Sequence, residues 1–470
     1  MSAERAGLLA VIVALGCGAP ATAPEAVSET ERRSEEPAQS AVLAGSHRDP
    51  RRPENPVTET VAVTETVTGT VAVTETVAVT GTEAEAALPS IPSRTREGDP
   101  PSPEAETLIA IDTHCDTTQR LLDEQADLTQ RLPDGHLDLP RMREGGLTAA
   151  FMSIWVDPRR YSGEAGWART QALVRAVRDF VAAHPDEVVL ATTAHEVREA
   201  AARGRIAFLM GLEGAHGLGE AEPTVLLERL TLLAEDGVRY VTLTWTNDNV
   251  FAHASTGAHP GRGLTEHGRA LVRRMNDLGM IVDVSHVSDR TALDALAVTR
   301  APVLASHSGA RAVGDHPRNL PDSVLRRIAE NRGAVCLNYY AAFVDPAYGE
   351  ARRAVERAHR AEFDALPSGR SWSTSTARTA LVRRLAPELR PPTLRTLGAH
   401  FAHVASITGP GGVCLGSDFD GVGELPEGMN DVSDLPALFR ELERRRLDVR
   451  LTAGENVLRV MEAVEAAASR

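Results

Sequence analysis

Eight short runs of apolar, β-prone residues follow one another after residue 106, and they constrain the fold more than any other feature of the sequence. Most of them are separated by longer segments with helical apolar spacing, such as 167–183, 264–278 and 322–331. This alternation indicates an α/β protein, a (β/α)8 barrel of the TIM type with inserted helices. The longest interval, 341–412, should hold the inserted helices, one of which includes His400 and His403. The runs are Leu108–Thr113, Thr148–Val156, Ile206–Leu212, Tyr240–Trp245, Met280–Ser285, Pro302–Ser306, Gly333–Tyr339 and Val413–Ser417.

Imidazoles and carboxylates stand at the ends of five of these runs. In a parallel barrel the C-terminal ends of all strands open onto one face, where enzymes of this architecture build their active sites. The sequence therefore predicts that three histidines and three carboxylates meet at one rim of the barrel. They are His114, Asp116, Glu213, His286, His307 and Asp418.

The types and spacing of these residues favour a site for two metal ions. Imidazole nitrogen and carboxylate oxygen suit zinc, manganese, cobalt or ferrous iron. His114 and Asp116 share one face of an extended segment, so both can bind one ion. His286 and His307, which end adjacent strands, can bind a second ion, with Glu213 between the two pairs. All 50 basic residues are arginine, so a carbamylated lysine is excluded and the bridge must be a carboxylate.

No single member of this set is diagnostic, because a lone histidine at a strand end is more often structural than a ligand. Asp420, which precedes a glycine, fits a turn better than a catalytic role. The six residues together favour paired ions that hold a hydroxide and polarise a carbonyl or phosphoryl oxygen. Asp418 would lie beside that hydroxide, orient it and shuttle its proton.

The stretches that contain these residues resemble the membrane dipeptidase family, also called renal dipeptidase or peptidase M19, in the form of a bacterial lipoprotein-type member. The resemblance extends from Ile109 to Val457. It implies a (β/α)8 barrel with two zinc ions, or other divalent transition metals, that hydrolyses dipeptides to free amino acids by a metal-bridging hydroxide. The matching stretches are IDTHCD, GLEGAH, YVTLTWTND, VDVSHVSD, ASHSGAR, HPRNLPD, CLNYY and GSDFDGV.

The resemblance also implies roles for the six rim residues. One zinc ion would be bound by His114 and Asp116, and the other by His286 and His307. Glu213 would bridge the two ions and so take part in catalysis.

Asp418, the sixth rim residue, and three residues outside the rim set also receive roles by the same resemblance. Asp418 would be the catalytic acid and base, and Arg318 would clamp the terminal carboxylate of the substrate, which suits a planar guanidinium. Tyr340 would lie near the substrate. Trp245 stands where animal members carry a histidine that contacts the tetrahedral intermediate, and an indole cannot act as acid or base. His253 could return to the site, although a loop histidine is the favoured interpretation.

Residues 1–17 have the features of an export signal. The apolar run 6–16 is too short to span a membrane and suits a signal peptide. Cys17 follows Ala-Leu-Gly, as in a bacterial lipobox, so a lipid on Cys17 would anchor the exported protein to a bacterial membrane. Secretion into the periplasm or medium, and a wrongly assigned start of the protein, are the alternatives.

Residues 18–105 are rich in Ala, Glu, Thr, Val, Pro and Ser, and Val57–Thr82 repeats a VTETVA unit imperfectly. No aromatic residue precedes residue 106. Without large apolar side chains such a segment cannot offset the entropy of ordering, so we expect a disordered spacer, with a self-pairing strand tract as the alternative. Residues 106–470 would form the binuclear metal-dependent dipeptidase barrel.

Three cysteines follow Cys17, and an odd number cannot pair completely within one chain. Cys336 and Cys414 stand inside apolar runs, where cysteine behaves as a small buried hydrophobic residue. We therefore expect no disulfide scaffold. The side chain of Cys115 should point away from the metals, into the barrel wall.

Three functions fit the sequence. The first is a zinc dipeptidase with a dipeptide as its substrate. The second is a related binuclear-metal hydrolase of amides, β-lactams or lactones, and the third is a non-catalytic binding lipoprotein of the cell surface. The formal net charge of −15 argues against nucleic acid as a partner. A homodimer is implied by the family resemblance alone.

Overall fold

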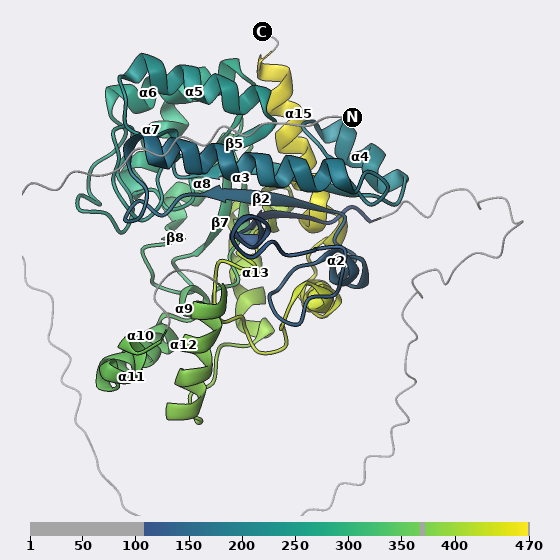
Figure 1. The fold of residues 1–470 in the computed structure, drawn as a ribbon, viewed down its shortest axis with the longest axis vertical. Coiled ribbons are helices and arrows are strands. Elements are labelled where there is room, and N and C mark those ends of the chain that lie inside the picture. The colour runs from purple at the N-terminus through teal and green to yellow at the C-terminus, as the bar shows by residue number, and fades with distance from the viewer. Residues whose placement is uncertain (1–107, 367–371, 469–470) are drawn as a thin grey trace, which may run out of the picture. The chain divides into compact units, whose positions relative to one another are not determined.

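The computed structural model of the chain describes residues 108–366 and 372–468 (Figure 1). The proposed signal peptide with Cys17 and the spacer with its Val57–Thr82 repeat lie outside the described residues. In the described ranges, none of the helices combines the length and the apolar character needed to cross a bilayer.

Eight parallel strands close into a barrel, and each coincides with one of the eight predicted runs. They are β1 (Ile111–Cys115), β2 (Ala149–Trp155), β4 (Ile206–Glu213), β5 (Val238–Thr242), β6 (Ile281–Asp283), β7 (Leu304–Ala310), β9 (Ala334–Leu337) and β10 (Val413–Leu415). Neighbours pair in that order, and β10 pairs with β1 through Leu415 and Asp112. The prediction of a (β/α)8 barrel is confirmed. Two short strands were not predicted: β3 (Val188–Leu190) pairs with β4, and β8 (Asn319–Leu320) pairs with β7.

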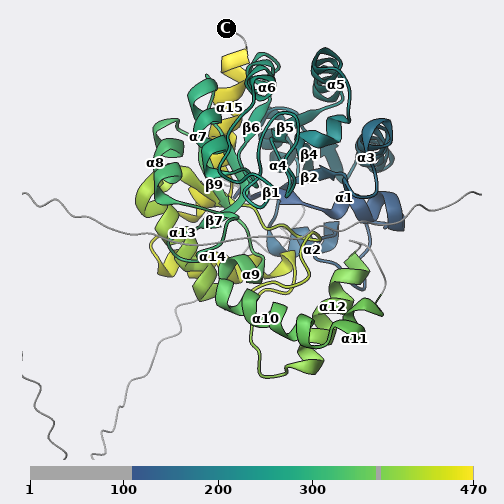
Figure 2. The ribbon, with the colours of Figure 1, turned by 90° about the vertical axis from the view of Figure 1, so that its left-hand side faces the viewer.

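Helices surround the strands, which gather at the centre of the view in Figure 2. Their starts follow local sequence signals. The Thr193 hydroxyl accepts the Glu196 amide hydrogen while the Glu196 carboxylate accepts the Thr193 amide hydrogen, which is a capping box. The helices are α1 (Thr117–Gln119), α2 (Leu139–Gly145), α3 (Gly163–Ala183), α4 (Ala194–Ala202), α5 (Pro223–Glu235), α6 (Glu266–Asp277), α7 (Asp289–Val298), α8 (Asp322–Glu330), α9 (Ala341–Val344), α10 (Pro346–Ala358), α11 (Arg360–Asp364), α12 (Trp372–Leu385), α13 (Leu394–Thr408), α14 (Leu435–Arg444) and α15 (Asn456–Ala468).

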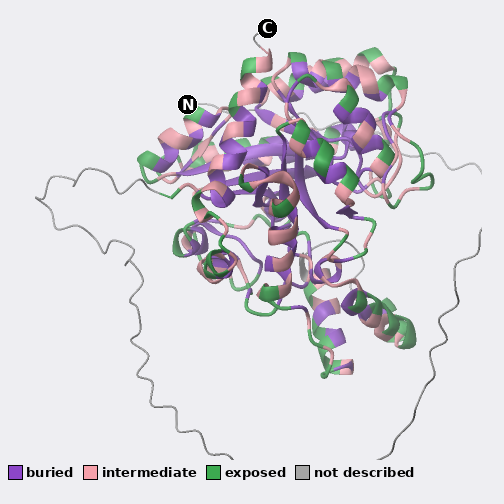
Figure 3. Cartoon of the chain, turned by 180° about the vertical axis from the view of Figure 1, so that it is seen from behind, coloured by how far each residue is buried: buried purple, intermediate pink, exposed green. Residues whose placement is uncertain are grey.

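The barrel is closed by apolar packing at the end where its strands begin. The first residues of several strands, among them Ile111, Ala149 and Leu304, form one buried cluster with Val197 of α4 and Val457 of α15. Figure 3 shows the strands as almost entirely buried. Because this end is filled, the opposite rim, where the strands end, is left for polar side chains.

The long interval 341–412 carries the inserted helices, as predicted, and α13 includes His400 and His403. Helices α10 to α12 extend away from the barrel in Figures 1 and 2. Glu424, which follows β10 and is 2% exposed, holds them. Its carboxylate accepts hydrogen bonds from Tyr348 and Arg352 of α10 and from Arg383 of α12. One buried acid thus joins the insertion to the segment beyond β10.

The prediction about cysteine pairing is wrong. Cys336 of β9 and Cys414 of β10 lie directly opposite each other in the parallel register and form a disulfide. The apolar runs correctly indicated burial, but not that the two strands are neighbours. Cys115 is the free cysteine of the described residues, and its Sγ atom lies 3.4 Å from the carbonyl oxygen of Phe151, in the barrel wall as expected.

Replacement of Glu424 by alanine should destabilise the protein. The change leaves the buried Arg352 guanidinium with only the partly exposed Glu356 as a carboxylate partner, and breaking a buried pair costs about 3–5 kcal/mol. Urea unfolding of the full chain followed by circular dichroism measures the loss. The matched control Glu350→Ala removes an exposed carboxylate of α10 and should change stability by about 0.5 kcal/mol or less. Equal unfolding midpoints for the two variants would contradict the proposed anchor.

Candidate metal centre

The rim of the barrel brings the six predicted side chains together. His114 belongs to β1, Glu213 ends β4 and His307 lies within β7, whereas the other three stand within three positions of the ends of β1, β6 and β10. All six residues are 9% exposed or less. Residues up to 304 positions apart in the sequence therefore form one buried cluster: His114, Asp116, Glu213, His286, His307 and Asp418.

Glu213 lies at the centre of the three histidines. Its Oε2 atom is 3.5 Å from Nε2 of His114. Its Oε1 atom faces the other side, 2.9 Å from Nε2 of His286 and 3.6 Å from Nε2 of His307. The Nε2 atoms of His286 and His307 are themselves 2.9 Å apart. The two oxygens of one carboxylate thus face different imidazoles, although the rings of His114 and His307 also stack with their centres 3.7 Å apart.

Asp116 and Asp418 complete the side of the cluster around His114. Asp116 Oδ2 is 3.8 Å from His114 Nε2, and these three residues offer ligand atoms within 4.8 Å of one another. Gly421 makes this approach possible, because a Cβ atom there would lie 2.1 Å from Asp116 Oδ2 and 2.4 Å from Asp418 Oδ1. The glycine of the Asp-Phe-Asp-Gly segment is required by the carboxylates that it faces.

Two rim residues have backbones in the left-handed region. His286 has φ of 67° and Asp418 has φ of 65°. Such angles are uncommon for residues other than glycine, although His and Asp tolerate them better than most. They occur at positions where the surrounding structure fixes the direction of a side chain. Here they turn an imidazole and a carboxylate toward the centre of the rim.

A second layer of hydrogen bonds orients the rim histidines. Nδ1 of His114 lies 2.8 Å from the Tyr240 hydroxyl, and Nδ1 of His307 lies 2.8 Å from the Ser306 hydroxyl. Ser306 in turn donates to Asp283 at 2.6 Å. When Nδ1 carries the proton, the Nε2 lone pair is free to bind a cation. These contacts fix the ring orientations of His114 and His307, whereas Nδ1 of His286 has no hydrogen-bond partner among the described residues.

Roles for these supporting residues are not predicted by the sequence. The same holds for Asn338, whose side-chain amide donates a hydrogen bond to Asp418 Oδ2 at 2.8 Å. The sequence feature that could have indicated such supporting residues is a polar residue inside an otherwise apolar run. Asp283 in the stretch VDVSH is such a residue, and so is Asn338 in CLNYY. Asp420, interpreted as a turn residue, is 8% exposed and accepts hydrogen bonds from Thr117 and from the His136 backbone.

The donor set fits divalent transition metal ions. His114 Nε2 and Asp116 Oδ1 are buried without a hydrogen-bond partner among the described residues, which is costly unless a ligand satisfies them. Burial would lower the pKa of His114, but the nearby carboxylates, Glu213 foremost, raise it to about 10. Burial lowers the pKa of His286 to about 3, so that its imidazole is neutral. A cluster that combines carboxylates with a neutral imidazole is suited to binding cations.

The rim opens into a cavity of about 1380 Å³ that the three predicted substrate residues also line. Arg318 is 3% exposed, and one of its amino groups donates to the His307 carbonyl at 3.1 Å. Its Nε and Nη1 atoms have no hydrogen-bond partner among the described residues. The Trp245 ring centre lies 6.5 Å from that of His286, and Tyr340 packs on Phe343 at 4.8 Å. A buried guanidinium with unpartnered N–H donors can bind an anionic group through hydrogen bonds.

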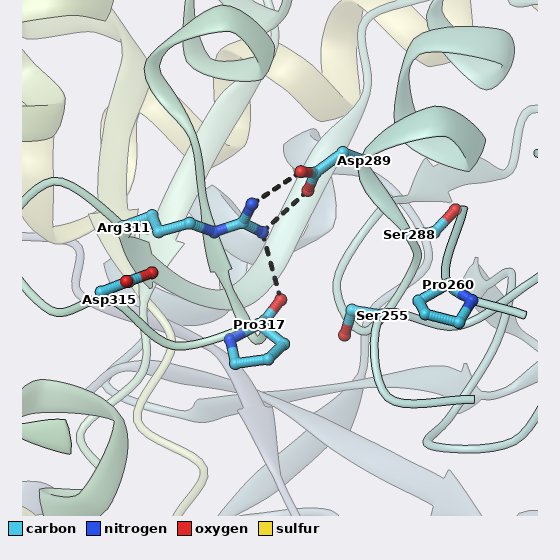
Figure 4. Close-up of a pocket in the computed structure, with 7 residues that line it drawn as sticks. All are labelled: Ser255, Pro260, Ser288, Asp289, Arg311, Asp315 and Pro317. Atoms are coloured by element: carbon cyan, nitrogen blue, oxygen red, sulfur yellow. Dashed lines mark hydrogen bonds and ion pairs between the residues drawn. The ribbon is translucent and has the colours of Figure 1, made fainter. Parts of the chain in front are cut away.

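A smaller cavity of about 210 Å³ lies beside the segment that follows His286 (Figure 4). Arg311 is its cation, and both oxygens of Asp289 accept hydrogen bonds from the Arg311 guanidinium. The Pro317 carbonyl accepts another, so the charge and donors of Arg311 are already used. The larger cavity at the rim is therefore the candidate site.

A sequence model of one family, described as membrane dipeptidase (peptidase family M19), matches residues 105–470. An uncharacterised dipeptidase of Schizosaccharomyces pombe is 35% identical over 341 residues, which cover 69% of this chain and 72% of the relative. Dipeptidase verJ of Clonostachys rogersoniana is 31% identical over 340 residues, which cover 70% of this chain and 75% of the relative.

The fold is also similar to solved structures of dipeptidases. A metallopeptidase of Rhodobacter sphaeroides, liganded with a phosphinate mimic of the dipeptide L-Ala-D-Ala, has a TM-score of 0.62 and 28% identity and covers 76% of this chain and 99% of its own. Dipeptidase AC, a metallopeptidase, has a TM-score of 0.61 and 29% identity with the same coverage. The chain belongs to the membrane dipeptidase family, peptidase family M19, and is a metallo-dipeptidase.

Proposed function

We propose that the protein hydrolyses dipeptides to free amino acids with two zinc ions bound at the rim. The observation that carries this proposal is the position of Glu213, whose Oε2 atom faces His114 and whose Oε1 atom faces His286 and His307. His114 and Asp116 would hold one ion, and His286 and His307 the other. When bound, such ions lower the pKa of water and polarise a carbonyl oxygen. Other divalent transition metals suit the same donors.

Asp418 is proposed as the acid and base of the reaction. Asn338 fixes one of its oxygens, and burial raises its pKa to about 6, with Glu213 adding to the effect and His114 opposing it. A carboxylate of this kind can accept a proton from water as the water attacks the peptide carbonyl. The same oxygen can then give that proton to the departing amine, which completes the cleavage without a further acid.

Arg318 is proposed to bind the terminal carboxylate of the substrate. Its unused Nε and Nη1 donors match the two oxygens of a carboxylate. Because Arg318 also donates to the His307 backbone, a carboxylate held there would lie close to the rim and place its neighbouring peptide bond at the centre. Trp245 and Tyr340 would form walls of the substrate site.

A related amide, β-lactam or lactone hydrolase is the second candidate. It is favoured by the volume of the cavity, about 1380 Å³, which exceeds the roughly 300–1,000 Å³ of most small-molecule sites. Such a substrate would use the same rim residues but would not need a free carboxylate beside Arg318.

We further propose that the protein is exported and anchored by a lipid on Cys17, with residues 18–105 as the spacer. The disulfide between Cys336 and Cys414 supports export, because such bonds persist in oxidising compartments. A homodimer remains a prediction from the family resemblance.

Glu213→Gln should abolish most activity, because the neutral amide cannot act as an anionic bridge between the two proposed ions. We expect the metal content of the purified full chain to fall and kcat/KM for dipeptides to drop at least ~100-fold. Metal analysis and amino-acid release measure the two effects. Glu222→Gln, at an exposed position, should behave like the parent protein. Parental turnover in Glu213→Gln would disprove the bridging role.

Arg318→Ala should lower kcat/KM for dipeptides at least ~100-fold by removing a charge-assisted pair of hydrogen bonds. The same variant should hydrolyse a dipeptide amide, which lacks the carboxylate, almost as well as the parent does. Arg160→Ala changes an exposed arginine of the same cavity and is the matched control. If dipeptides and dipeptide amides lose activity equally, Arg318 does not bind the carboxylate and the second candidate gains support.

Removal of metal should abolish the activity, and zinc should restore it. Full-length protein dialysed against a chelator is assayed with a panel of L-L and L-D dipeptides before and after stepwise addition of zinc. Activity should return as the rim fills, and it should be complete only after two ions per rim are bound. Sustained hydrolysis by metal-free protein would rule out the proposed chemistry.

A further inference from the structure

Three residues of the loop between β5 and α6 form a second cluster of metal-ligating side chains, which the proposed function does not use. Asp248 Oδ2 lies 3.2 Å from Nδ1 of His253 and 3.0 Å from Nδ1 of His259. The ligand atoms of all three lie within 4.8 Å of one another. Two imidazoles and a carboxylate therefore converge outside the rim.

Hydrogen bonds account for the position of His259 beside Asp248, but not for that of His253. Asp248 Oδ2 accepts the backbone N–H of His259 at 3.0 Å and is also hydrogen-bonded to His259 Nδ1 at 3.0 Å. The Nδ1 atom of His253 is buried and makes no hydrogen bond of acceptable geometry among the described residues, despite its distance of 3.2 Å from this oxygen. This nitrogen and the carboxylate oxygen are close enough to bind one shared cation.

The dimensions of the cluster suit one tetrahedral ion. Ligand atoms about 2.0–2.1 Å from zinc are separated by roughly 3.3 Å, and two bound imidazoles have ring centres roughly 5 Å apart. The ring centres of His253 and His259 are 5.6 Å apart, and the rings meet at 71°. Two nitrogens and one carboxylate oxygen are donors that zinc prefers.

The loop is built to hold the carboxylate in this position. Asp248 Oδ1 accepts the Ala254 backbone N–H at 2.8 Å, which leaves Oδ2 to face the imidazoles. Gly257 closes the other side, since a Cβ atom there would lie 2.0 Å from Oδ1. The acidic ligand is thus oriented by the backbone before any cation arrives.

The cluster is connected to the rim through the backbone. Ala254 bridges Val287, the Ser255 N–H donates to the His286 carbonyl at 2.8 Å, and the Ser288 N–H donates to the His253 carbonyl at 2.9 Å. Ser255 and Ser288 are both visible at the small cavity in Figure 4. An ion at the cluster would therefore fasten the loop to the segment that carries His286.

We propose that Asp248, His253 and His259 form a third, structural site for a divalent transition metal, with zinc as the ion that its donors favour. His259 is 52% exposed, so water would complete the coordination. The site fastens the β5–α6 loop and takes no part in the hydrolysis itself.

Metal counting tests the proposal. Full-length protein, His259→Ala and His253→Ala are stripped of metal, equilibrated with excess zinc and freed of unbound ion before elemental analysis. The parent should retain one zinc ion per chain more than either variant. His267→Ala, an exposed histidine of α6, is the matched control and should retain the parental amount. This difference does not depend on how many ions the rim binds, so it separates the third site from the proposed catalytic centre.

Trypsin provides a second readout, because Arg262 is an exposed cleavage site in the same loop. Zinc at ten times its dissociation constant should slow cleavage after Arg262 roughly tenfold in the parent and not in His259→Ala. Dipeptide hydrolysis by His259→Ala in zinc-replete buffer should equal that of the parent. Equal zinc content in the parent and both loop variants, with no protection of Arg262, would overturn the proposal.

Discussion

Three buried carboxylates lie close together at the rim and repel one another, and the surrounding fold holds them in place. Asp116, Glu213 and Asp418 are each 9% exposed or less, so water screens their charges poorly. The fold offsets this repulsion with hydrogen bonds to the charged oxygens and with imidazoles between them. The remaining surplus of negative charge is what makes the rim a site for cations.

The barrel interior, more than the loops, supplies the supporting contacts. The Asp283 carboxylate accepts hydrogen bonds from Thr242 of β5, from the Ser285 backbone and from both the backbone and the hydroxyl of Ser306. One side chain thereby links three consecutive strands just below two of the rim histidines. Groups held on strands in this way keep their positions more accurately than groups held on loops.

The sequence predicted the barrel and the rim well, because strands buried on both faces appear as continuous apolar runs and their ends share one face. It did not predict β3 and β8, which are too short to show a pattern. The disulfide was missed because Cys336 and Cys414 are 78 residues apart and become neighbours only through strand order. Roles for Tyr240 and Asp283 could not be predicted, because their partners are set by the registers of adjacent strands.

The left-handed backbone at His286 and Asp418 limits how these positions can change in evolution. Many side chains can bind a metal or move a proton, but few tolerate a positive φ, and β-branched residues tolerate it least. A drift from histidine to another ligand at position 286 must therefore satisfy the main chain as well as the chemistry. Asparagine, aspartate and glycine are the exchanges that the local geometry permits, and each would sacrifice the imidazole. Few substitutions at these two positions are therefore compatible with both the backbone and the chemistry.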